Sequence, residues 1–269
     1  MIVLALSIVA FLAGFIDAIA GGGGLLSVPA LLMAAGNPHI ALATNKGQSV
    51  FGSFASLVSF HRAGRVDKAR ALPSFVSAFC GSLIGVRLAL RLRPELLRPV
   101  VLALLVGVAL FFAVRSGRKR ATAAGWAVAH RHPVAAAAAI GLVLGGYDGF
   151  FGPGTGTFLI TLFVTVFGDD LTRATANAKV ANFASNLGSV ITFALAGLID
   201  LRLALPMAAA QAIGGVVGAR AAIRGGERVI RAGVLVVTLA IAARVGWQMT
   251  HATAAPAAAD AAGVDAKRD

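Results

Sequence analysis

The chain has 269 residues, of which 58% are hydrophobic and 13% are charged. Soluble globular domains contain roughly 45–50% apolar and about 25% charged residues, so this composition excludes an ordinary water-soluble fold. The formal net charge is +13, and the Lys and Arg residues cluster between apolar runs, where the positive-inside rule places them. We therefore predict an integral membrane protein without a nucleic-acid partner.

The first apolar run, residues 2–20, has one feature of a secretory signal peptide. Ala18-Ile19-Ala20 is similar to a cleavage site. However, no basic segment precedes the run, and Asp17 interrupts it. We expect it to be a retained span.

Ten apolar runs follow one another along the chain. A helix needs about 20 residues to cross the hydrocarbon core of a bilayer, and eight runs are near that length. The other two are too short and are predicted to be broken or re-entrant half-helices, which survive where protein or a water-filled cavity satisfies their backbone. The fold class predicted is all-α, with about eight transmembrane helices. The runs are residues 2–20, 25–35, 41–60, 71–90, 99–114, 133–151, 157–167, 174–196, 203–223 and 229–245.

The chain also contains an internal repeat. At a shift of 133 residues, Lys46 coincides with Lys179 and Asp67 with Asp200. Upstream, the shift is 131 residues, and Asp17 coincides with Asp148. Such matches are rare by chance in so apolar a sequence, so we predict two homologous membrane units. Whether the second unit is inverted depends on the number of crossings in each unit and stays open.

The repeat divides the chain into four predicted parts. A first membrane repeat covers residues 1–115, and a second covers residues 133–249. The basic linker between them is residues 116–132, and an Ala-rich tail, residues 250–269, is predicted to be disordered.

Glycine-rich breaks follow the first run of each unit. Such breaks are typical of transporters, whose substrate sites lie where interrupted helices meet. A helix that restarts after a break directs free N–H groups and the positive end of its dipole inward, which favours an anion. The alternative is close helix packing through small residues. The candidate substrate-binding residues here are Gly22, Gly23, Gly24, Gly154 and Thr155.

A lysine lies inside an apolar run in each unit. Lys46 follows Asn45, and Lys179 precedes Asn182 by three residues. A lysine at the centre of a spanning helix costs about 2.5–3.5 kcal/mol, so it requires a partner or a water-filled cavity. We predict that these four residues bind a substrate anion. The alternative is that each lysine lies near a helix end and extends to the headgroups.

Three further residues are candidates beside the breaks. Asp17 and Asp148 could pair with the lysines, cap the break, or exchange a proton as coupling residues, because burial favours the neutral carboxyl. Tyr147 could donate a hydrogen bond to a substrate oxyanion, and the alternative is anchoring at the membrane interface.

Catalytic and metal-binding patterns are not found in the sequence. The only cysteine is Cys80, and no histidine pair has the spacing of metal ligands. We therefore expect no enzyme activity, no cofactor and no metal. The expected partners are a small anionic substrate and the lipid bilayer, and a homodimer is left open.

Several stretches resemble the TauE/SafE sulfite exporter family, also called TSUP, and within it the YfcA-like branch of probable membrane transporters. They are the segments 14–29, 41–46, 147–153 and 174–179. The resemblance covers roughly residues 2–248. It implies about eight transmembrane helices in two repeats in a prokaryotic inner membrane, and transport of sulfite, sulfoacetate or related organosulfonates.

Together these observations predict a multi-pass secondary transporter of the cell inner membrane that moves a small sulfur-containing anion and could be coupled to protons. A passive anion channel is the first alternative. A cation or metal transporter that uses Asp17 and Asp148 is the second, and a membrane-embedded enzyme or scaffold is the third.

Overall fold

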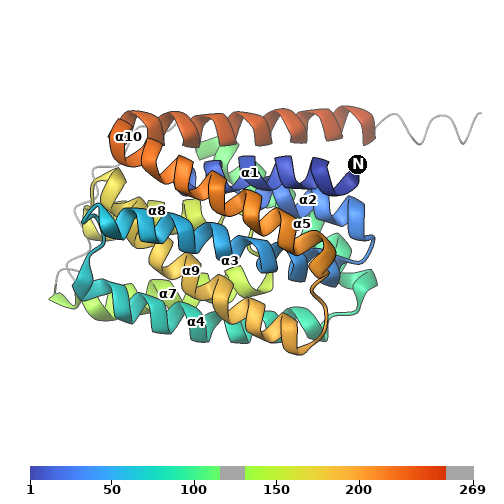
Figure 1. Ribbon diagram of the computed structural model, residues 1–269, viewed down its shortest axis with the longest axis horizontal. Coiled ribbons are helices and arrows are strands. Elements are labelled where there is room, and N and C mark those ends of the chain that lie inside the picture. The colour runs from blue at the N-terminus through green and yellow to red at the C-terminus, as the bar shows by residue number, and fades with distance from the viewer. Residues whose placement is uncertain (116–130, 253–269) are drawn as a thin grey trace, which may run out of the picture.

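The computed structural model describes residues 1–115 and 131–252, and in these residues it contains helices and no strands. The helices lie roughly along the longest axis of the molecule (Figure 1). Their bounds are α1 (Ile2–Ala20), α2 (Gly24–Ala35), α3 (Pro38–Arg62), α4 (Lys68–Arg91), α5 (Pro94–Arg115), α7 (Pro133–Phe150), α8 (Thr155–Phe167), α9 (Leu171–Leu195) and α10 (Leu201–Ala252).

The distribution of side chains is that of a membrane protein. Leu4, Ile8 and Leu12 are spaced four residues apart on α1 and face outward, with exposed fractions of 69%, 56% and 46%. Lys46 and Lys179, in contrast, are buried. Apolar groups outside and charged groups inside suit a bilayer and not water. The predicted all-α integral membrane fold is confirmed.

Four of the described helices are long and apolar enough to cross a membrane: α1, α4, α7 and the segment Leu201–Gly233 of α10. Both predicted short helices are present as α2 and α8, with 12 and 13 residues. Helix α10 is interrupted at Gly226, whose φ of 56° and ψ of −145° are not helical, as expected between the runs 203–223 and 229–245. The count of about eight crossings stays a prediction.

Two pairs of helices pack through glycines at equivalent positions of the repeat. A Cβ added to Gly81 of α4 would lie 2.2 Å from a backbone oxygen of α7, and one added to Gly214 of α10 would lie 2.1 Å from a backbone oxygen of α1. Gly85 and Gly218 make the same contacts one turn later, at 2.0 and 2.3 Å. Such close backbone approach is typical of membrane helices that pack through small residues. The predicted duplication would give such matching contacts, and it stays a prediction.

Contacts at the ends of α3 and α9 show that these equivalent helices are antiparallel. Asp67, just after α3, donates its N–H to Asn177 in the first half of α9, at 2.8 Å. Asp200, just after α9, donates its N–H to Thr44 in the first half of α3, at 3.1 Å. Each helix therefore begins where the other ends. An inverted second unit, which the sequence left open, would give this relative direction of α3 and α9.

The predicted linker and tail fall almost entirely on residues 116–130 and 253–269, which lie outside the described residues.

Candidate functional site

The two helix breaks meet at the centre of the described structure. Gly21, between α1 and α2, has φ of 77°, and Gly152, between α7 and α8, has φ of 97°. A Cβ on Gly21 would lie 2.2 Å from the carbonyl carbon of Gly156, so the two backbones are in contact. The Thr157 hydroxyl also donates to the Ala20 carbonyl at 2.7 Å. Left-handed φ values favour glycine at such turns, which explains the glycine-rich sequence of both breaks.

Short polar residues set the depth of both lysines. Asn37 caps α3 by accepting from a backbone N–H at 2.8 Å, and Asp170 caps α9 in the same way at 2.9 Å. N-terminal caps of this kind fix where a helix begins. Lys46 and Lys179 lie the same number of residues after the starts of their helices. Each lysine therefore lies equally far from the start of its own helix, and these two starts are at opposite ends of the antiparallel pair.

Each lysine forms an ion pair with the aspartate of the other unit. Lys46 Nζ lies 2.8 Å from Asp148 Oδ1, and Lys179 Nζ lies 2.7 Å from Asp17 Oδ2. The two lysine side chains are 3% and 0% exposed, which excludes the alternative that they extend to the headgroups. Pairing is what a buried charge requires. Of the roles open to the aspartates, pairing with the lysines is observed.

The two ion pairs have different surroundings. Asp148 also accepts a hydrogen bond from the Ser185 hydroxyl, and Lys46 donates to Asn186 Oδ1 at 3.2 Å. Lys179 donates to the backbone carbonyl of Asp17 in addition to its carboxylate. The two halves of the site are therefore similar in charge and unlike in hydrogen bonding.

A cavity separates the two pairs. The volume open to the centres of water molecules is about 20 Å³. A water needs roughly 10–15 Å³ by this measure, so the cavity admits about one water and is too small for a sulfite-sized anion without rearrangement. Its walls are formed by Asp17, Gly21, Gly24, Asn45, Lys46, Ser49, Asp148, Gly152, Gly156, Asn182, Asn186 and Gln211.

Six of the predicted site residues line this cavity: Asp17, Gly24, Asn45, Lys46, Asp148 and Asn182. Lys179 contacts it through its ion pair with Asp17. Asn45 is held by the Ser27 hydroxyl, which donates to Asn45 Oδ1 at 2.6 Å.

The other predicted residues support the breaks. The Tyr147 hydroxyl donates to the Pro153 carbonyl at 2.8 Å, and the Thr155 hydroxyl donates to the Gly152 carbonyl at 2.6 Å. Neither side chain lines the cavity.

Gly22, Gly23 and Gly154 also belong to the breaks and do not line the cavity. The Gly22 and Gly23 carbonyls accept from N–H groups in the first turn of α2, at 3.0–3.2 Å. Gly154 precedes α8 in a left-handed conformation. Several N–H groups at the start of α2, which were predicted to face an anion, therefore donate to backbone carbonyls instead.

The sequence prediction missed Gln211. This residue is 2% exposed on α10 and lines the cavity. The repeat could not reveal it, because the position equivalent to Gln211 is Ala78. An available signal was a primary amide within the apolar run 203–223, since such polar groups in spans mark functional sites.

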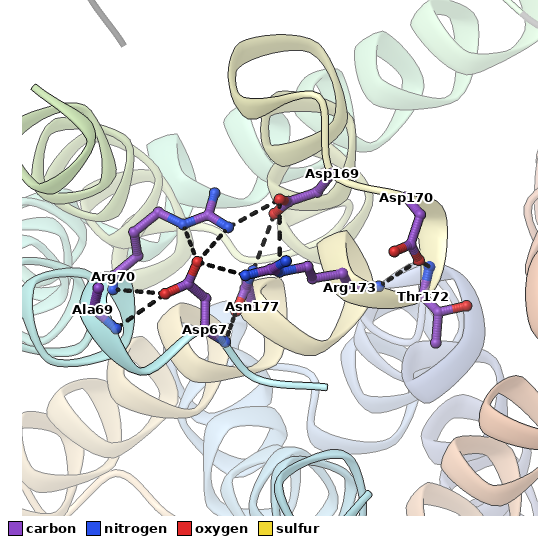
Figure 2. Close-up of polar contacts among 8 residues, drawn as sticks. All are labelled: Asp67, Ala69, Arg70, Asp169, Asp170, Thr172, Arg173 and Asn177. Carbon is purple, nitrogen blue, oxygen red and sulfur yellow. Dashed lines mark hydrogen bonds and ion pairs between the residues drawn. The ribbon is translucent and has the colours of Figure 1, made fainter. Parts of the chain in front are cut away.

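A second charged cluster joins the units at one end of α3 and α9 (Figure 2). Arg70 Nη2 lies 2.8 Å from Asp67 Oδ2 and 2.9 Å from Asp169 Oδ1. Arg173 Nη2 lies 3.0 Å from Asp67 Oδ2, and Asn177 donates to Asp169 at 3.0 Å. Burial opposes ionisation of Asp67, but the hydrogen bond and positive charge of Arg70 outweigh it and lower the pKa of Asp67.

At the opposite end Asp200 is equivalent to Asp67, but the partners of that aspartate have uncharged equivalents. A shift of 133 residues matches Arg70 with Leu203, Asp169 with Gly36, and Arg173 with Ile40. The two ends of the antiparallel pair therefore differ, because the arginines that pair with Asp67 have no equivalents near Asp200.

Comparisons with known proteins agree with this architecture. The family model "Sulfite exporter TauE/SafE" matches residues 6–245. "Probable membrane transporter protein ORF9" of Sinorhizobium sp is 36% identical over 248 residues, which are 91% of this chain and 93% of that protein. "Probable membrane transporter protein YfcA" of Escherichia coli K12 is 35% identical over 242 residues, 88% of this chain and 87% of that protein. No solved structure matches the chain.

Proposed function

Because the chain belongs to the sulfite exporter TauE/SafE family, whose relatives are named probable membrane transporters, we propose that it is a secondary transporter. Its proposed substrates are small sulfur-containing anions such as sulfite or an organosulfonate. The proposed location is the cell inner membrane, and the proposed coupling ion is the proton. The chain itself is a membrane protein of a transporter family, and no feature described above favours an enzyme.

One observation carries the proposal: two buried lysines, each paired with an aspartate of the other unit, lie beside a small polar cavity. The ammonium groups are the natural partners of a sulfonate or sulfite, since charge-assisted hydrogen bonds are the stronger ones. In the structure the aspartates are paired with these ammonium groups. An incoming anion therefore competes with the carboxylates for the lysines.

Charge balance links this competition to protons. The two lysines and two aspartates are neutral together when all four are ionised. Adding a monovalent anion leaves one uncompensated negative charge, which is costly inside a membrane protein. Protonation of Asp17 or Asp148 removes that charge and frees its lysine for the anion. In this mechanism one proton accompanies each monovalent anion.

Flux into proteoliposomes tests the proposal. We expect Lys46→Met combined with Lys179→Met to abolish uptake of sulfite and organosulfonates driven by a proton gradient, because both ammonium groups are lost. Lys68→Met is the matched control, since Lys68 is exposed at the start of α4. Undiminished uptake by the double variant would refute the mechanism.

The same assay separates a carrier from a passive channel. The small volume of the cavity, about 20 Å³, supports a carrier, in which flux saturates with substrate and responds to an imposed proton gradient. A channel would give flux that rises in proportion to substrate and is unchanged by protons at zero membrane potential. Each carboxylate is occupied by a lysine, which also weighs against a cation transporter.

A further inference from the structure

Gln211 is the residue at which the two halves of the site differ most. In each unit a glycine of the first helix packs on the equivalent backbone position of the other unit: Gly14 on Gln211, and Gly145 on Ala78. The backbones are thus arranged alike, but only Gln211 carries a side chain long enough to reach the cavity.

A second difference accompanies the first. Ser185 donates to Asp148, but the position equivalent to Ser185 is Gly52. A Cβ added to Gly52 would lie 2.6 Å from Gln211 Cγ. The space beside α3 that a side chain at Gly52 would need is therefore filled by Gln211. On one side a serine hydroxyl is bonded to the aspartate, and on the other a carboxamide faces the cavity.

The carboxamide of Gln211 is incompletely bonded. Its Nε2 donates to Ser49 Oγ at 3.3 Å. Its Oε1 is buried and has no hydrogen-bond partner among the described residues. Leaving a buried acceptor without a partner is unfavourable, and Gly14 and Gly52 pack so closely on Gln211 that the side chain has little room to turn away.

We propose that Gln211 contacts the substrate and sets its specificity by accepting a hydrogen bond from a donor group on the bound anion. The lysines bind the negative oxygens, and Gln211 Oε1 binds an O–H or N–H elsewhere on the same molecule. The preferred substrate class is then a small monovalent sulfonate that carries a hydroxyl or amino group. This inference rests on the proposed anion transport.

Matched substrates test the contact in the wild-type protein. The probes are 2-hydroxyethanesulfonate and propanesulfonate, which have the same charge and similar size but differ in the hydroxyl donor. We expect kcat/KM in proteoliposome flux to be about threefold to tenfold higher for the hydroxylated probe, as for one neutral hydrogen bond. An equal or reversed preference would overturn the inference without any variant.

Gln211→Met then locates the contact. Methionine has a similar length and no amide, so we expect the ratio of kcat/KM for the two probes to fall to about one. Gln48→Met is the control, because Gln48 is also buried with an unpartnered Oε1 among the described residues, but it does not line the cavity. A preference that survives in Gln211→Met, or is lost equally in both variants, would refute a role specific to Gln211.

The outcomes also separate this inference from the proposed function. If the lysine variants abolish flux and the Gln211→Met variant keeps the wild-type preference, only the role of Gln211 is wrong. If wild-type protein transports neither probe nor sulfite, the proposed function fails first.

Discussion

Removal of one member of the Lys46–Asp148 ion pair should destabilise the protein much more than removal of both. The two side chains are each 3% exposed, and the two charged atoms are 2.8 Å apart. Breaking a buried pair by deleting one partner leaves an uncompensated charge and costs about 3–5 kcal/mol, whereas replacing both with apolar residues is often nearly neutral. We therefore expect Asp148→Leu to lower the unfolding temperature by roughly 10 °C. Asp148→Leu combined with Lys46→Met should regain most of that loss.

Thermal unfolding of purified protein in detergent measures these differences, and flux in proteoliposomes accompanies it. Glu227→Gln is the control for an exposed pair, because Arg231 and Glu227 are 59% and 42% exposed and 2.7 Å apart. Such surface pairs contribute about 0–1 kcal/mol. We expect the double variant at the buried pair to be stable and inactive in transport.

Two results would contradict this reasoning. A single Asp148→Leu substitution as harmless as Glu227→Gln would mean that the carboxylate is not compensating a buried ammonium group. A double variant that is no more stable than the single one would mean that packing around the pair, and not its charge, determines the cost.

Two further predictions concern the fold. Gly85→Ala and Gly218→Ala should each destabilise the protein by about 1–3 kcal/mol in thermal unfolding, because the new Cβ would lie 2.0 or 2.3 Å from a backbone oxygen of the adjacent helix. Gly107→Ala should cost nothing, since no described atom lies within 4 Å of its Cβ. The lowered pKa of Asp67 beside Arg70 means that its ionised form stabilises the fold above the unfolded value of 3.8. That contribution is lost as the pH falls below this value toward the lowered pKa of the folded state, so Asp67→Asn should flatten the fall of unfolding temperature with pH below about pH 4.

The sequence predicted most of the helices because the apolar runs and their glycine breaks are unambiguous. The two short helices were expected from runs of about eleven residues, and α2 and α8 have nearly these bounds. The charged residues of the site were also expected, since Lys46 and Lys179 cannot lie in apolar runs without partners. What these predictions share is that each depends on local sequence alone.

The partners of those charges could not be predicted. Within each unit an aspartate precedes a lysine, which fits pairing inside the unit as well as pairing between units. The observed pairs join Lys46 to Asp148 and Lys179 to Asp17. That choice depends on how α1 packs on α10 and α7 on α4, and no local pattern encodes it. The sequence prediction missed Gln211 for a related reason, because comparison of the repeats reveals only the residues that both units share.

The crossed pairs and the antiparallel direction of α3 and α9 have a joint consequence for the proposed transport. Every ion pair across the cavity joins one unit to the other, so a movement that separates the units stretches both pairs at once. Neither lysine can leave its carboxylate without another negative partner, because both are buried. In the proposed mechanism the anion supplies that partner and the proton neutralises the abandoned carboxylate. Hence the same two ligands that balance the charge of the site also remove the contacts that hold it closed, which is the requirement for coupled transport.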